Sequence, residues 1–102
     1  MYLSLIIPAY KEATRIGVSL EKIFAYFASV PYEVEILVVD DGSPDNSVEV
    51  IREALLQKKT DRKIVAKLIE LGTNQGKGGA VRTGMLQAKG AIRIFTDADL
   101  ST

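Results

Sequence analysis

The chain of 102 residues fits one domain, and its 47% hydrophobic and 25% charged residues are ordinary for a globular protein. Its 13 basic and 13 acidic side chains give a net charge of zero, so we expect no nucleic-acid partner. The lack of cysteine and histidine excludes disulfides, thiolate metal sites, zinc hydrolysis and histidine acid–base chemistry by this chain alone. Any bound metal must therefore be an oxygen-ligated hard cation such as Mg²⁺ or Mn²⁺.

The chain begins with a predicted strand–helix–strand unit. Residues 3–7 form a short apolar run closed by Pro8, which is typical of a buried strand. Residues 34–39 are apolar nearly throughout and predict the second strand. Between them, residues 14–29 have the apolar spacing of an amphipathic helix, with Ile16, Leu20, Ile23, Phe24 and Phe27 on one face.

The second strand leads into a turn and a second helix. Residues 40–44 combine Asp, Gly, Ser and Pro, which is a strong turn signal. The next helix is predicted from about residue 45 to 56, with Asp45 or Asn46 as its cap. Residues 64–69 predict the third strand.

The last third of the chain predicts a polar, glycine-rich loop at 72–79, a third helix at 79–89 and a fourth strand at 91–96. Gly90 is the expected C-terminal stop of that helix. Small residues on the inner face of the helix permit close packing on a sheet: Ala80, Val81, Gly84, Met85 and Ala88.

Strands and helices alternate throughout, and the strands are apolar on both faces. This pattern predicts an α/β fold, a three-layer sandwich with a parallel sheet covered by helices on both sides. Right-handed crossovers and a switch point between the first and fourth strands predict the strand order 3-2-1-4. Ligands of such sheets bind beyond the carboxyl ends of the strands, where the polar residues of this chain gather.

Asp97 and Asp99 follow the fourth strand two residues apart. Both carboxylates can approach one hard cation. Alternatively, one can bind the cation while the other accepts a hydrogen bond from a ribose hydroxyl. A capped turn is the plain structural alternative, but the pairing of the two residues favours metal or nucleotide binding.

Other candidate contacts follow the first two strands. Asp40 or Asp41 could accept from a base N–H or a ribose hydroxyl, or could cap a turn. Tyr10 could stack under a base, or be a half-buried aromatic residue. Glu12 by default is a solvated residue at the start of a helix.

Gly76–Gly79 lead into a helix whose first N–H groups favour an anion, and Lys77 and Arg82 add positive charge. A flexible glycine turn is the alternative.

The spacing from Gly72 is one residue short of a phosphate-binding P-loop, and the glycines do not form the dinucleotide-binding fingerprint. ATPase and dehydrogenase functions are therefore excluded.

Two alternative functions remain at this point. Residues 94–101 nearly fit the nucleophile motif of haloacid-dehalogenase-like phosphotransferases, with Asp97 as the nucleophile. However, Ser101 replaces the usual Thr or Val, and that motif normally lies on the first strand of its domain. The second alternative is a non-catalytic nucleotide-binding or regulatory domain, in which Asp40 and Asp41 resemble a receiver-type acidic pocket.

Four motifs in this order resemble family 2 glycosyltransferases of the GT-A fold, which include dolichyl-phosphate glucosyl- and mannosyltransferases. They are residues 5–12, 38–45, 74–84 and 97–99, the last resembling the DXD motif of the family. The common form of the first motif has Asn where this chain has Lys11. The resemblance spans essentially the whole chain, so we expect residues 1–102 to be the nucleotide-sugar-binding N-terminal part of a truncated glycosyltransferase domain.

The resemblance implies a role for each matching residue. Asp99 and Asp97 would reach a Mg²⁺ or Mn²⁺ ion, and a general base, if the acceptor needs one, would lie beyond Thr102. The residues expected to contact the nucleotide are Pro8, Ala9, Tyr10, Glu12, Asp40, Asp41, Lys77 and Asp97.

The resemblance also implies an inverting glycosyltransferase of glycan or cell-wall biosynthesis. UDP-glucose is favoured over GDP-mannose, because residues 76–85 look more like the glucosyl branch. The acceptor would be a polyprenyl phosphate, or a glycan, and the location cytoplasmic, at the membrane face. We expect this fragment alone to be inactive, its fourth strand to promote self-association, and any membrane attachment to lie beyond Thr102.

Overall fold

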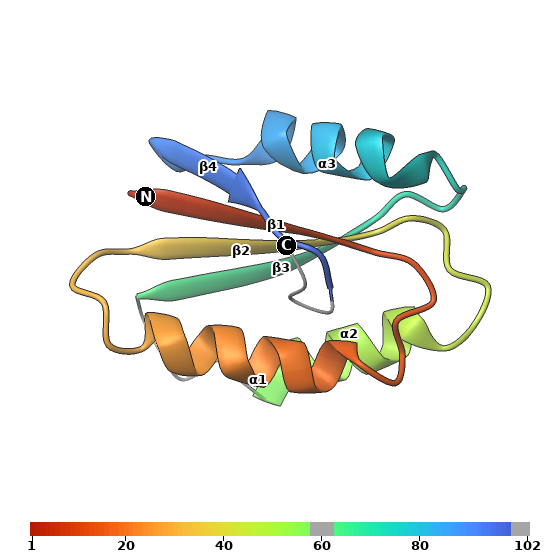
Figure 1. The fold of residues 1–102 in the computed structure, drawn as a ribbon, viewed down its shortest axis with the longest axis horizontal. Helices are drawn as coiled ribbons and strands as arrows, with labels where there is room; N and C mark the ends of the chain where they lie inside the picture. The colour runs from red at the N-terminus through yellow and green to blue at the C-terminus, as the bar shows by residue number, and fades with distance from the viewer. Residues whose placement is uncertain (58–62, 99–102) are drawn as a thin grey trace.

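The computed structural model describes residues 1–57 and 63–98, which form four strands alternating with three helices (Figure 1). All strand pairs are parallel and their order is β3-β2-β1-β4, so the predicted sheet and strand order are confirmed. The elements are β1 (Leu3–Ala9), α1 (Ile16–Phe27), β2 (Val34–Asp40), α2 (Ser47–Gln57), β3 (Ile64–Glu70), α3 (Gly76–Gln87) and β4 (Ile92–Phe95).

The sheet separates two helical layers, with α3 on one face and α1 and α2 on the other (Figure 1). Every residue of the apolar stripe predicted for α1 is buried, and it packs with inward-facing residues of β1 and β2. Burying each such side chain stabilises the fold by roughly 1.5–3 kcal/mol relative to leaving it exposed. On the other face, a smaller core joins Ile6, Leu37 and Val39 to Ala80 of α3 and to Ala88 just after it.

The backbone of helix α3 lies directly against side chains of the sheet at Gly84. A Cβ atom built at Gly84 would lie 2.6 Å from Cγ2 of Ile6 and 3.2 Å from Cγ2 of Val39. No side chain fits such a gap without displacing the sheet. The small residues predicted for the inner face of this helix therefore set how closely α3 approaches the strand ends.

Pro8 lies inside β1 and does not close the strand, contrary to the expectation from sequence. The N–H of Thr96 donates to the carbonyl of Ile6, so Ile6 directs its backbone groups toward β4. Pro8, two residues further on, faces the same side, but β1 and β4 stop pairing at Ile6 and Phe95. The missing N–H of Pro8 therefore removes no hydrogen bond from the sheet.

Helix α3 begins at Gly76, three residues before its predicted start, so Gly76–Gly79 form its first turn and are not a loop. The side chains of Asp41 and Asn74 order this turn by accepting hydrogen bonds from the backbone N–H groups of Gln75 and Gly76. Gly90 is not the helix stop either, because α3 ends at Gln87 and Ala88 is already extended. Glycine is required at position 90 because a Cβ atom there would lie 2.5 Å from the nitrogen of Ser4.

Strand β4 is shorter than predicted and is an exposed edge strand. Ile92, Ile94 and Phe95 are each more than two-fifths exposed, although Phe95 lies on the opposite face of the sheet from Ile92 and Ile94. Helix α3 packs over β1 and β2, and α2 packs over β2 and β3. The predicted helices on both faces of the sheet are confirmed, but they leave the edge strand β4 exposed.

A buried carboxylate ties the connection between α3 and β4 to the sheet. Oε1 of Glu35 accepts the hydroxyl of Ser4 at 2.8 Å and the N–H of Lys89 at 2.9 Å, and Gly90 donates its N–H to Ser4 Oγ at 2.8 Å. Lys67 Nζ lies 3.9 Å from the other carboxylate oxygen. Since buried charge is stable only when hydrogen-bonded or paired, this network orients the start of β4.

Among the described residues, no helix is long and apolar enough to cross a membrane.

Candidate functional site

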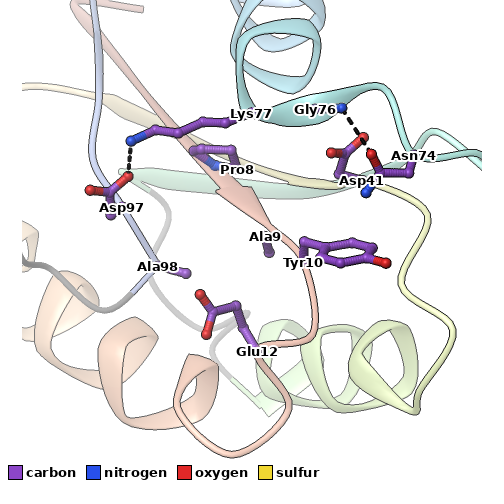
Figure 2. A pocket seen from close by; sticks show the side chains of 10 residues that line it. All are labelled: Pro8, Ala9, Tyr10, Glu12, Asp41, Asn74, Gly76, Lys77, Asp97 and Ala98. Atoms are coloured by element: carbon purple, nitrogen blue, oxygen red, sulfur yellow. Dashed lines mark hydrogen bonds and ion pairs between the residues drawn. The ribbon is translucent and has the colours of Figure 1, made fainter.

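A cavity of about 350 Å³ lies at the carboxyl ends of β1, β2 and β4, beside the first turn of α3 (Figure 2). This is the switch point of the sheet, because β1 leads to α1 on one face, whereas its neighbour β4 is reached from α3 on the other face. The segments that follow β1 and β4 meet there, as the predicted switch point between the first and fourth strands requires. The cavity is lined by Pro8, Ala9, Tyr10, Glu12, Asp41, Asn74, Gly76, Lys77, Asp97 and Ala98.

All residues expected to contact the nucleotide line this cavity except Asp40. Arg82, expected to add charge near a phosphate, is exposed on α3 and does not line it either. The metal ligand expected at Asp99 lies outside the described residues. Gly76 belongs to the segment that the sequence predicts to favour an anion. Asn74 had no predicted role of its own, although its place just after the third strand is a usable signal.

The two neighbouring aspartates after β2 have different roles. Asp40 is 1% exposed, and its carboxylate accepts the N–H and the hydroxyl of Ser43 at 3.0 and 2.7 Å. Its oxygens are therefore directed into its own turn, away from the cavity. Asp41 lines the cavity, and its Oδ1 accepts the N–H of Gln75 at 2.7 Å. Asp41 thus joins the loop after β2 to the start of α3.

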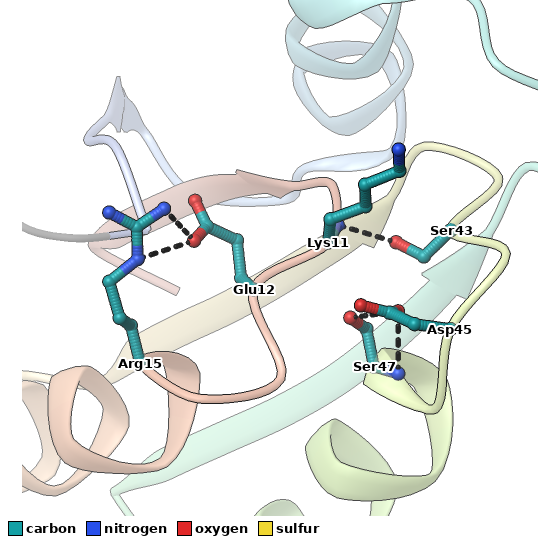
Figure 3. A network of polar contacts seen from close by, with 6 residues as sticks. All are labelled: Lys11, Glu12, Arg15, Ser43, Asp45 and Ser47. Atoms are coloured by element: carbon teal, nitrogen blue, oxygen red, sulfur yellow. Dashed lines mark hydrogen bonds and ion pairs between the residues drawn. The ribbon is translucent and has the colours of Figure 1, made fainter.

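The aromatic side of the cavity comes from the loop after β1. Tyr10 is 40% exposed, and Lys11 Nζ lies 5.3 Å from the centre of its ring. Lys11 has a φ of 56°, in the left-handed region, and its N–H donates to Ser43 Oγ at 3.0 Å (Figure 3). The hydroxyl of Ser43 thus links the two loops, which holds the Tyr10 ring at the rim of the cavity.

Asp45 stabilises the same rim by capping α2. Its Oδ1 accepts the N–H of Ser47 at 3.0 Å as well as the Ser47 hydroxyl (Figure 3). The hydrogen bonds from Ser47, helped by the charge of Lys11, lower the pKa of Asp45 below its ordinary value of 3.8. Asp45, and not Asn46, is therefore the side chain that caps this helix.

Glu12 forms the lower wall of the cavity, with its carboxylate directed toward Ala98 (Figure 2). Its side chain is 14% exposed, and Oε1 is ion-paired with Arg15, whose Nε lies 2.8 Å away. The Glu12 carbonyl accepts the N–H groups of Arg15 and Ile16, which starts α1. Glu12 is thus a held carboxylate in the cavity wall and not a freely solvated one.

The opposite wall is the positive end of α3. Asn74 Oδ1 accepts the N–H of Gly76 at 3.2 Å, and Gln75 provides no side-chain cap. The next N–H groups of the first turn have no acceptor within the helix, which favours an anion at this position. Lys77 extends over Pro8, and its Nζ is ion-paired with Oδ1 of Asp97 (Figure 2).

The cavity offers oxygen donors suited to a hard cation. Asp97 and Glu12 present carboxylates, and the chain has no histidine or cysteine to compete with them. Mg²⁺ and Mn²⁺ prefer this donor set. Within residues 1–57 and 63–98, no three acidic side chains lie together as a metal-binding group.

Comparison with known proteins supports a single family. The model of "Glycosyl transferase family 2" matches residues 4–102. A dolichyl-phosphate beta-glucosyltransferase from Drosophila melanogaster is 42% identical over 98% of this chain and 31% of its own length. An undecaprenyl-phosphate 4-deoxy-4-formamido-L-arabinose transferase from Edwardsiella ictaluri is 36% identical over 97% of this chain and 29% of its own.

Solved structures agree with the sequence relatives. A mannosyltransferase from Pyrobaculum calidifontis, in complex with GDP-Man and Mn²⁺, matches 95% of this chain with a TM-score of 0.80 and 32% identity. TarS from S. aureus, in complex with UDP, matches 97% with a TM-score of 0.81 and 29% identity. The chain covers 27% and 28% of these two structures, so it spans less than a third of the proteins it resembles.

Proposed function

Because this chain belongs to glycosyl transferase family 2, we propose that it is the nucleotide-sugar-binding part of an inverting glycosyltransferase. In this proposal the donor is UDP-glucose, with GDP-mannose as the alternative, and the acceptor is a polyprenyl phosphate. The observation that carries it is the convergence on one cavity of four parts of the chain: residues 8–12, 41, 74–77 and 97–98.

The cavity divides into a nucleoside end and a phosphate end. Tyr10 supplies an aromatic face for the base, and Asp41 and Glu12 supply acceptors for base N–H groups and ribose hydroxyls. At the other end, Lys77 and the first turn of α3 present positive charge to the diphosphate. A nucleoside diphosphate has this same separation of a flat ring from charge.

The transfer itself is a single in-line displacement at the anomeric carbon. The bond from that carbon to the diphosphate oxygen breaks while a bond to an acceptor oxygen forms, so the configuration inverts. A bound Mg²⁺ or Mn²⁺ would help to neutralise the negative charge that develops on the leaving diphosphate. In this chain, Lys77 lies where it would add to that neutralisation, while Asp97, with Asp99, would hold the cation. A phosphate acceptor is already anionic and needs no base to remove a proton.

The choice of donor and acceptor rests on the relatives. The Drosophila relative is named for glucosyl transfer to dolichyl phosphate, and the Edwardsiella relative for transfer to undecaprenyl phosphate. Both acceptors are polyprenyl phosphates. GDP-Man is bound in the Pyrobaculum structure and UDP in TarS, so nucleotide preference is the first property to measure.

The test is calorimetric titration of UDP, GDP and ADP into the protein, with and without Mn²⁺. We expect UDP to bind most tightly of the three, and more tightly with the cation than without it. Tyr10→Ala should weaken UDP binding, whereas the matched change Tyr26→Ala, at an exposed tyrosine on α1 away from the cavity, should not. Failure of every nucleotide to bind at any Mn²⁺ concentration would favour the non-catalytic regulatory alternative.

The phosphotransferase alternative makes a different prediction for Asp97. As a nucleophile, Asp97 would form an aspartyl phosphate, and fluoroberyllate would trap the protein in a stable adduct. Here Asp97 follows the last strand and is ion-paired with Lys77, and the family match covers residues 4–102. We expect no adduct by mass spectrometry or ¹⁹F NMR, and its appearance would count decisively against the transferase.

A further inference from the structure

The ion pair between Lys77 and Asp97 spans the phosphate end of the cavity. Lys77 is the second residue of α3, and Asp97 comes two residues after the end of β4. The Nζ atom of Lys77 contacts Oδ1 of Asp97 and lies 5.6 Å from the centre of the Phe95 ring. Because β4 is an edge strand, this contact is a bridge from α3 to the open side of the sheet (Figure 2).

Each partner of this pair is the group that a different ligand requires. A diphosphate is attracted by the ammonium of Lys77, and a divalent cation is attracted by the carboxylate of Asp97. While the two are paired, each offsets the other's charge, and the contact uses one N–H of Lys77 and one carboxylate oxygen of Asp97. The pair therefore weakens the attraction of Lys77 for a diphosphate and of Asp97 for a divalent cation.

We infer that the Lys77–Asp97 pair opens when the donor binds, so that nucleoside diphosphate and divalent cation each favour binding of the other. This inference rests on the proposed function. A diphosphate that takes Lys77 releases Asp97 for the cation, and a cation that takes Asp97 releases Lys77 for the diphosphate. The coupling is reciprocal, as linkage between two sites requires.

The size of the effect follows from how exposed the pair is. The side chains of Lys77 and Asp97 are 55% and 29% exposed, so water screens their attraction. Such pairs contribute up to about 1 kcal/mol, which corresponds to a change in affinity of up to about fivefold. The pair is therefore weak enough for a ligand to open and strong enough to measure.

The test measures Mn²⁺ binding without nucleotide, from the EPR signal of free Mn²⁺, in the wild type and in Lys77→Met. Because Met removes the charge but keeps the side-chain length, Asp97 is released, and Mn²⁺ should bind up to about fivefold more tightly. UDP binding in the presence of Mn²⁺ should weaken in the same variant. Arg82→Met, at an exposed cation on α3 outside the cavity, should change neither.

Asp97→Asn provides the converse measurement. It should strengthen UDP binding without metal and reduce the gain that Mn²⁺ gives. A purely structural role for the pair would weaken both ligands in both variants, and urea unfolding checks that the fold is kept. Mn²⁺ binding to Lys77→Met that is no tighter than to the wild type, or undetectable in both, overturns the inference. If UDP still binds the wild type in that case, the proposed function stands.

Discussion

The backbone N–H of Gln75 donates a 2.7 Å hydrogen bond to Oδ1 of Asp41, so a carboxylate at the end of β2 holds the turn that starts α3. Asp41 is 3% exposed, and its own N–H donates to the carbonyl of Ala9 at 2.8 Å. Asp41 therefore connects the end of β1 to the loops that follow β2 and β3. In the proposed function the same residue faces the nucleoside.

Asp41→Ala should lower both stability and nucleotide affinity. Loss of a hydrogen bond to a charged group predicts a decrease of roughly 1.5–3 kcal/mol in the free energy of unfolding. Asp41→Asn keeps an acceptor oxygen and should recover most of that loss. Urea denaturation measures stability, and calorimetry measures UDP binding. An Asp41→Ala variant as stable as the wild type would contradict the role of this hydrogen bond.

Asp40→Asn is the matched comparison. Asp40 is buried and bonded to Ser43 but does not line the cavity. The variant should therefore lose stability while its folded fraction binds UDP with wild-type affinity. A loss of affinity larger than that of Asp41→Ala would show that the assignment of the two carboxylates is reversed.

Gly84→Ala should destabilise the fold, because the new Cβ would lie 2.6 Å from Ile6. Overpacking of a filled core typically costs about 1–3 kcal/mol, measured here as a lower urea midpoint. Gly78→Ala, in the same helix, has nothing within 4 Å of the new Cβ and should raise stability by up to about 1 kcal/mol. Equal effects at the two glycines would refute the close approach of α3 to the sheet.

Lys11→Asn should stabilise the chain. Lys11 has a φ of 56°, and asparagine tolerates the left-handed region better than lysine does. The gain should be part of the roughly 1–2 kcal/mol that this region costs an ordinary residue. Lys11→Val, with a β-branched side chain, should lower the melting temperature. Thermal unfolding of both variants checks the prediction, and a more stable Val variant would oppose it.

The cap of α2 should depend on pH. The folded-state pKa of Asp45 is lowered, so its stabilising effect is fully present above the ordinary value of 3.8 and is lost as the pH falls through the lower folded-state value. Unfolding free energies of the wild type and Asp45→Ala, measured from pH 7 down to pH 2, should therefore converge at the acid end. A difference that stays constant with pH would mean that the charge of Asp45 contributes nothing.

The sequence by itself determined the order of elements, the parallel sheet and the place of the site. Buried strands and one-sided helices leave a clear hydrophobic pattern, such as the stripe from Ile16 to Phe27. Once those elements alternate, chain connectivity brings the carboxyl ends of the strands together. The grouping of Tyr10, Asp41 and Asp97 around one cavity follows from that topology.

Only the tertiary structure decided which of two adjacent aspartates faces the cavity. Asp40 and Asp41 are the same residue type, so only their hydrogen-bond partners distinguish them. Ser43 engages Asp40, while Gln75, distant in sequence, engages Asp41. The start of α3 was placed too late for the same reason, since acceptors outside the helix order its first turn. The exposure of β4 depends on where α3 lies over the sheet, and contacts between distant segments leave no periodic signal in the sequence.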